Sequence, residues 1–241
     1  MPPARITVLA VLAALGVSCG SGPPPAIDPA LAASVPPAAT ILAGVNLERV
    51  RASPLYRKFP PAALAFIESL GTSSRSVLFA SDGGNSLVLR PGLAAMGSPD
   101  WVRAAGSSRG AANGLIPRAE PLAATSDIWV VAAGNANLPF TGNGENLNRM
   151  LNATEYATLS VKLTDQIAIE AVGMCPGAET GRHLEETLRA FLMLGGAGAA
   201  RQPALADLLR RIRVTREDRA VYVNLMAAPG ELEVLFESAS H

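Results

Sequence analysis

Histidine and cysteine each occur only twice in this chain of 241 residues, and aromatic side chains make up 5% of it. Histidine is the commonest acid–base group at neutral pH and a frequent metal ligand. Two copies, His183 and His241, are too few for a metal site, and a Ser-His-Asp triad would have to recruit His183, which lies in a polar helix start. We therefore expect no metal, no cofactor and no catalysis that depends on histidine.

Charge of one sign is also lacking, because 20 Lys and Arg residues balance 20 Asp and Glu residues. Nucleic-acid binding needs an excess of clustered positive charge, so we do not expect nucleic acid as a partner. Two cysteines cannot build a disulfide framework. Cys175 follows the apolar residues Val172 and Met174 and precedes Pro176, which predicts a buried structural cysteine at a strand end.

The first nineteen residues carry a short secretory signal. Arg5 is followed by an apolar run from Ile6 to Val17, and Ser18 precedes Cys19. The run is about 12 residues long, whereas a membrane-spanning helix needs about 20. An ordinary cleaved signal with a free cysteine nearby is the alternative to lipid attachment.

Leu15-Gly16-Val17-Ser18-Cys19 resembles the lipobox of bacterial lipoproteins. The resemblance implies cleavage before Cys19, a diacylglycerol on its sulfur and acylation of its amine, so that the protein binds a membrane through this lipid. Gly20 follows in place of the aspartate that retains some lipoproteins at the inner membrane. The implied location is therefore the cell envelope, on the outer membrane facing the periplasm.

Residues 19–39 are rich in Pro, Gly, Ser and Ala, and they include Pro23-Pro24-Pro25 and Pro36-Pro37. This composition favours extended polyproline geometry and offers little apolar material for a core. We predict a tether that holds the folded part up to about 60 Å from the lipid, at about 3 Å per residue.

Strands and helices alternate after residue 40, and strand, helix, hairpin, helix occurs twice, with starts at Ile41 and Ile128. This order predicts an α+β fold with two units, residues 40–125 and 126–241. Two tandem ferredoxin-like units, each an antiparallel sheet with helices on one face, are the first expectation. One continuous sheet with helices on one side is the alternative.

Several local patterns are specific. Asp82-Gly83-Gly84-Asn85 between two apolar runs predicts a hairpin. Residues 157–163 alternate apolar and polar side chains, which predicts a strand with one buried face and one wet face. A helix is predicted at about 145–152, and helical spacing of apolar residues continues from Leu184 to Gly195. Trp101 and Trp129 lie in apolar segments and are expected in the core.

The most polar loop, residues 134–149, is the candidate surface for a ligand or partner. Asparagines tolerate left-handed turns, which explains many of them structurally. Long loops of this kind are also often functional. The candidate contact residues are Asn135, Asn137, Phe140, Asn143 and Asn146.

The sequence thus predicts a lipid-anchored envelope protein that binds a protein partner or a small ligand without catalysis. The alternative is a carboxylate-dependent, hydrolase-like envelope enzyme, because carboxylate sites leave no spacing pattern in a sequence. The two hypotheses differ structurally: an enzyme should show a deep pocket with converging ionisable groups, and a binding module a shallow apolar or amide-rich face.

Overall fold

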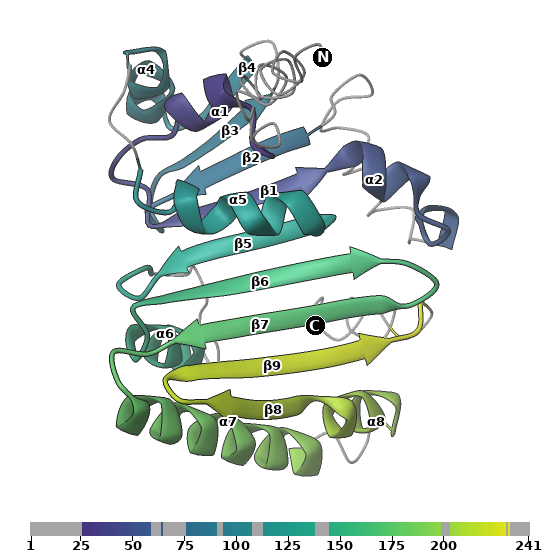
Figure 1. Ribbon diagram of the computed structural model, residues 1–241. Coiled ribbons are helices and arrows are strands. Elements are labelled where there is room, and N and C mark those ends of the chain that lie inside the picture. Colours follow the sequence, from purple (N-terminus) through teal and green to yellow (C-terminus); the bar gives the residue numbers. More distant parts are fainter. Residues whose placement is uncertain are drawn as a thin grey trace, which may run out of the picture.

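The computed structural model describes residues 26–58, 64, 76–90, 94–107, 113–137, 145–198, 203–229 and 231. Within these residues the strands form one antiparallel sheet of nine strands in the order β4-β3-β2-β1-β5-β6-β7-β9-β8 (Figure 1). The strands are β1 (Ile41–Asn46), β2 (Ser76–Ser81), β3 (Ser86–Arg90), β4 (Ala94–Gly97), β5 (Ile128–Ala133), β6 (Tyr156–Leu163), β7 (Ile167–Met174), β8 (Arg213–Glu217) and β9 (Ala220–Ala227).

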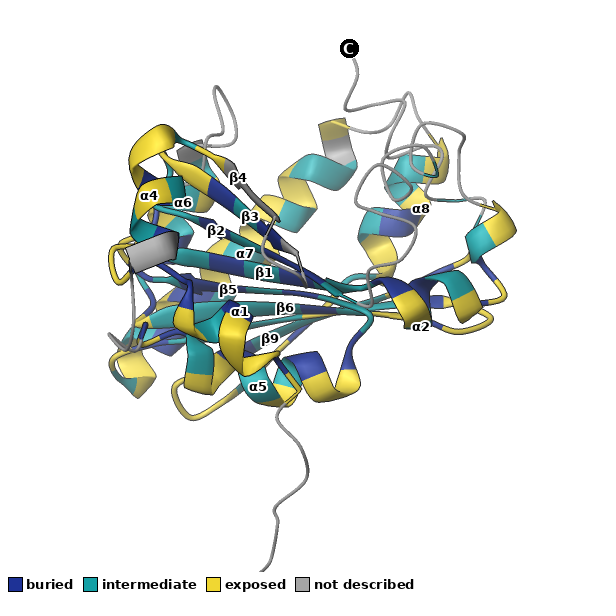
Figure 2. Cartoon of the chain, turned by 90° about the horizontal axis from the view of Figure 1, so that it is seen from above, coloured by how far each residue is buried: buried dark blue, intermediate teal, exposed yellow. Residues whose placement is uncertain are grey.

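The helices lie on both faces of this sheet, as Figure 2 shows with the sheet seen edge-on. The helical elements are α1 (Pro29–Ala33), α2 (Leu47–Ala52), the 3-10 turn η1 (Tyr56–Lys58), α4 (Pro99–Ser107), α5 (Ile116–Thr125), α6 (Glu145–Asn152), α7 (Ala178–Gly198) and α8 (Pro203–Arg211). We call the face that carries α1 and α5 the front face and the face that carries α6 and α7 the back face. In the described part of the chain, no helix is long and apolar enough to cross a membrane.

The α+β class is confirmed, but two ferredoxin-like units with helices on one face are not. β1 and β5 pair antiparallel, with Ile41 opposite Ala132 and Val45 opposite Ile128, so the two halves share one sheet. In a ferredoxin-like unit each helix joins two parallel strands that have another strand between them, whereas here β1 and β2, which flank α2, pair antiparallel with each other. The order of elements along the chain is compatible with either topology, because it does not specify which strands become neighbours.

Gly44 allows β1 and β5, and so the two halves of the sheet, to pair. It lies opposite Trp129 in the β1–β5 pairing, and a Cβ at this position would overlap the indole ring. Trp129 is 4% exposed and packs in the front core with Leu42, Leu78 and Val131. Trp101 belongs to the same cluster, so both tryptophans occupy the core as the sequence predicts.

The tether prediction is wrong for residues 26–39. Asp28 accepts a hydrogen bond from Ala30 N and caps α1, and Leu31 and Val35 are buried in the front core. The buried amide of Asn113 donates to the carbonyls of Pro36 and Ala39, each at 3.0 Å, and so fixes the end of the segment. The low apolar content of this segment led to the wrong prediction. A few apolar side chains are enough to hold a segment against the apolar face of a sheet.

The local predictions agree better with the structure. The β2–β3 hairpin forms around Asp82, whose carboxylate accepts hydrogen bonds from Gly84 N and Asn85 N. The β6–β7 hairpin and helix α6 also form where the patterns place them. Helix α5 was not predicted, because Pro117 and Pro121 interrupt its pattern; Pro117 lies at the helix start and Pro121 inside it.

Candidate functional site

The back face of the central strands is apolar and only half covered. Leu159 of β6 lies opposite Val130 of β5 and Ala171 of β7, and Ala171 lies opposite Val223 of β9. Strand side chains alternate between faces, so these four residues project from the same side of the sheet. Each remains partly exposed.

Helices α6 and α7 form the walls of a cavity over these strands, with a volume of about 520 Å³. We call this cavity the back groove. Its lining combines β5, β6, β7 and β9 with α6 and α7: Val130, Ala132, Leu147, Met150, Leu151, Thr154, Ala157, Thr158, Leu159, Ala171, Val172, Gly173, Leu184, Leu188, Val221 and Val223. Thr154 and Thr158 are the polar members of this set, and no ionisable residue is among the lining residues that the structure describes.

The groove occupies the face that the alternation in residues 157–163 predicts to be buried. Leu163 is buried, but Ala157, Leu159 and Val161 are only half-buried, while Ser160 on the opposite face is 8% exposed. The alternation shows which face is apolar and says nothing of what covers it. Leu147 on α6 is 40% exposed at the groove. An apolar cavity of this size is the usual form of a small-molecule site.

A second cavity, also of about 520 Å³, runs between α6 and α7. We call it the outer furrow. Met150 and Leu184 line both cavities, so the back groove and the outer furrow share a boundary made of two apolar side chains. Phe191 and Leu194 of α7 line the furrow and are 40% and 73% exposed, which is unusual for large apolar residues.

The polar groups of the furrow are unevenly paired. His183 of α7 lines the furrow, and its Nε2 lies 3.2 Å from Glu179. Beside the furrow on the same helix, Arg182 contacts Glu179 at 2.5 Å and Glu186 at 2.9 Å. The hydrogen bond from Arg182 lowers the pKa of Glu179 below its usual value. Arg149 of α6, by contrast, donates to the Asn146 amide oxygen and has no carboxylate partner among the described residues.

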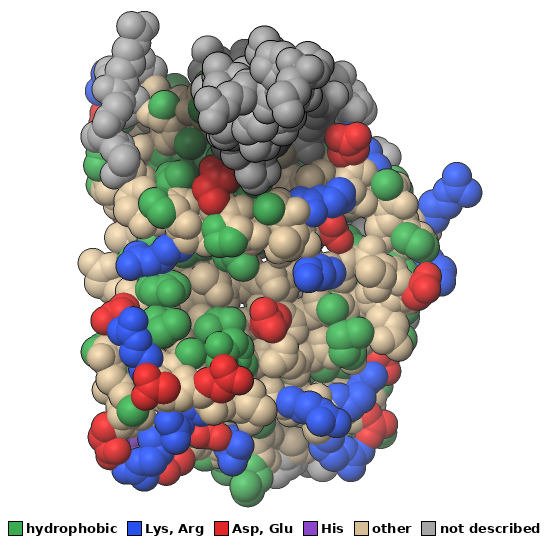
Figure 3. All heavy atoms as spheres, viewed as in Figure 1, with side chains coloured by type: hydrophobic (Ala, Val, Ile, Leu, Met, Phe, Trp, Pro, Cys, Tyr) green, Lys and Arg blue, Asp and Glu red, His purple; other side chains and the backbone are tan. Residues whose placement is uncertain are grey.

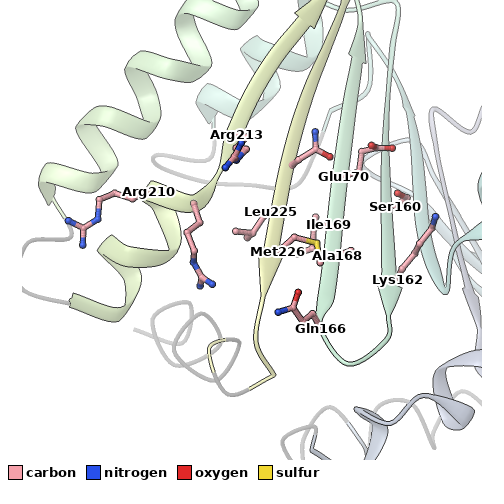
Figure 4. A pocket seen from close by; sticks show the side chains of 12 residues that line it. Ser160, Lys162, Gln166, Ala168, Ile169, Glu170, Arg210, Arg213, Leu225 and Met226 are labelled. Atoms are coloured by element: carbon pink, nitrogen blue, oxygen red, sulfur yellow. The ribbon is translucent and has the colours of Figure 1, made fainter.

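A polar cavity of about 590 Å³ lies at the lower part of the sheet, over β6, β7 and β9 (Figure 4). Lys162 projects from one side of it, and Arg210 and Arg213 lie on the other. Glu170 is the single carboxylate among its described lining residues, whereas hydrolysis by carboxylates usually needs two. In Figure 3, positive and negative side chains intermingle along the lower edge of the same face.

The amide loop expected from the sequence is only partly within the described residues. Phe140 and Asn143 lie outside them, and Cys19 does too. Asn135 and Asn137 are exposed, and Asn137 accepts a hydrogen bond from Asn148 at 3.0 Å. Asn146 lines the outer furrow, so this one candidate adjoins the groove. The groove residues themselves were not predicted as a site, because they come from six elements with no motif in common.

Other catalytic arrangements find little support in the described residues. Cys175 is fully buried directly after β7, and burial together with the charge of Glu155 raises the pKa of its thiol, so it is a structural residue as predicted. No group of three or more His, Cys, Asp or Glu residues is placed to hold a metal ion in the described part of the chain.

One serine motif begins in the last turn of helix α4. Gly106-Ser107-Ser108-Arg109-Gly110 has the Gly-x-Ser-x-Gly spacing of a nucleophile elbow. In an elbow the serine follows a strand, whereas here the preceding element is helix α4. Ser108 itself lies outside the described residues.

Comparisons with known proteins leave the family open. No family model matches the chain, and no curated protein matches it. Among solved structures, crystal form III of TP0453 is similar with a TM-score of 0.48 and 11% identity, and the match covers 88% of this chain and 98% of that one.

Proposed function

We propose that this chain is a lipid-anchored protein of the cell envelope that binds an apolar ligand in the back groove and does not catalyse a reaction on it. The groove carries the proposal, because its described lining is apolar apart from two threonines. Burial of each ligand methylene there contributes about 0.8 kcal/mol, so a long alkyl chain is a sufficient source of affinity.

The groove supports binding over catalysis on chemical grounds. An enzyme must place acid, base or nucleophilic groups against the reacting atoms. Of the two threonines, Thr158 lies opposite Val131 of the front core, so its side chain projects from the other face, and the Thr154 hydroxyl donates to the Leu151 carbonyl at 2.7 Å. The hydrolase-like alternative gains no comparable support from the polar cavity, where Glu170 lacks a second carboxylate among the described lining residues.

The length of the anchor sets how far the folded body lies from the membrane in this proposal. With residues 26–39 packed on the sheet, residues 20–25 alone separate Cys19 from the folded body. Even fully extended they span about 20 Å, at about 3 Å per residue. A lipid on Cys19 would therefore hold the folded body close to a membrane surface, with the anchor leaving from the front face, where Ala26 N donates to Glu120 of α5.

Binding can be tested on the exported Cys19→Ala chain, which keeps every described residue and carries no lipid. We expect saturable fluorescence of the uncharged dye N-phenyl-1-naphthylamine and its displacement by 1-dodecanol. Acid-unfolded chain serves as the control for nonspecific adsorption. A native chain that binds neither compound more strongly than the unfolded control would contradict the proposal.

Anchoring can be tested separately by the intact mass of the membrane fraction. We expect a chain that begins at Cys19 and carries a diacylglycerol and an additional acyl group, and we expect Cys19→Ala to leave the membrane fraction. A mature chain with an unmodified cysteine, or a Cys19→Ala chain that stays at the membrane, would contradict lipid anchoring and leave the groove proposal standing.

A further inference from the structure

We infer that the ligand of the back groove is an amphiphile with one alkyl chain and an anionic head group, and that Arg149 binds the head group. This inference rests on the proposed function and adds the class of ligand and the residue that selects it. The alkyl chain lies over the strands, and the head group lies in the outer furrow.

The first support is the continuity of the two cavities. Met150 and Leu184 line both, so the ligand would cross from the back groove to the furrow over these two side chains, of which Leu184 is buried and Met150 half-buried. Met150 is unbranched and adapts easily to neighbouring groups. The exposed ring of Phe191 continues the apolar surface into the furrow. The ligand therefore has an apolar path from the strands to the polar edge of α6.

The second support is the charge at that edge. Among the described ionisable residues that line the furrow, His183 faces Glu179 and Glu186, while Arg149 has no carboxylate partner. The single interaction of Arg149 that the structure gives is the hydrogen bond to Asn146. A guanidinium offers five donors, so most of those on Arg149 remain available to a ligand. Carboxylate and phosphate oxygens are the groups that match the planar fork of arginine.

The apolar groove and the nearby arginine together exclude other ligands of comparable size. A neutral hydrocarbon would fill the groove and leave Arg149 unused, and a cationic amphiphile would be repelled by it. A polar metabolite would meet apolar side chains along the strand residues of the groove that the structure describes. An anionic amphiphile can bury its alkyl chain against the apolar strands and pair its head group with Arg149, whether that head group is a carboxylate or a phosphate.

The test compares four amphiphiles of equal chain length below their micelle concentrations: 1-dodecanol, laurate, dodecyl phosphate and dodecyltrimethylammonium. Each displaces N-phenyl-1-naphthylamine from the Cys19→Ala chain. We expect laurate, dodecyl phosphate or both to bind about tenfold more tightly than dodecanol, and the ammonium compound more weakly than dodecanol. The better of the two anions identifies the head group.

Arg149→Gln should remove the preference for anions and leave the affinity for dodecanol unchanged. Arg149 is exposed, so the variant is expected to fold. Arg103→Gln on α4, away from both cavities, is the matched control and should keep the preference. Equal binding of dodecanol and the anions would overturn the inference, and so would an unchanged preference for anions in Arg149→Gln. In either case, binding of dodecanol would still support the proposed function. Failure of every compound, dodecanol included, would overturn both.

Discussion

The Ala171→Phe variant should lose at least about tenfold in affinity for an apolar ligand, which corresponds to about 1.4 kcal/mol. Ala171 lies at the floor of the back groove, between Leu159 on β6 and Val223 on β9. A phenyl ring at this position occupies the space that the alkyl chain needs. Because Ala171 is partly exposed and faces open space, the ring should be accommodated with little change in the free energy of unfolding. Dye displacement by dodecanol measures the loss.

Ala168→Phe provides the matched control. Ala168 lies on the same strand, is also half-buried and faces the polar cavity on the other side of the sheet. The same change in volume and apolar area should leave ligand affinity within about twofold, a difference well under 1 kcal/mol. If both variants bind like the parent chain, the ligand does not occupy the groove. If both lose affinity equally, the effect is on the sheet as a whole.

The Leu31→Ala variant should lose about 2–5 kcal/mol in the free energy of unfolding. Leu31 is 3% exposed on α1 and packs in the front core with Trp129 and Val131. Truncation leaves a cavity between α1 and the sheet that the neighbouring side chains cannot fill. Urea unfolding of the Cys19→Ala chain, followed by circular dichroism, measures the change.

Leu194→Ala is the control for this effect. Leu194 is 73% exposed on α7, so the same truncation removes little buried area and should change stability by no more than about 0.5 kcal/mol. A loss below 1 kcal/mol in Leu31→Ala would mean that residues 26–39 are a tether after all. The folded body could then lie farther from the membrane than the proposed arrangement allows.

The candidate site was harder to predict from the sequence than the elements that build it. Alternation in residues 157–163 identifies Leu159 as apolar-facing, and helical spacing does the same for Leu184 and Leu188. Their convergence on one cavity depends on how α6 and α7 pack against β5, β6, β7 and β9, and this packing involves residues about 90 positions apart. No sequence pattern indicated Arg149, because exposed arginines are common on short helices and the sequence does not show which of them have a carboxylate partner.

The sequence by itself determined the local structure of this protein. Period-two alternation and a glycine-rich turn specify the β6–β7 and β2–β3 hairpins, and the spacing of apolar residues specifies α6 and α7, because these patterns act over a few neighbouring residues. The scarcity of histidine and cysteine limited the chemistry, and the segment that ends at Cys19 suggested the anchor.

The tertiary structure alone decided three features. β1 pairs with β5 and makes one sheet of two halves, residues 26–39 pack on the front face, and the apolar back face stays half open. Each depends on which surfaces meet in the folded chain. A one-dimensional pattern shows which residues need to be buried, but the helices that dock on the sheet determine which of them are covered.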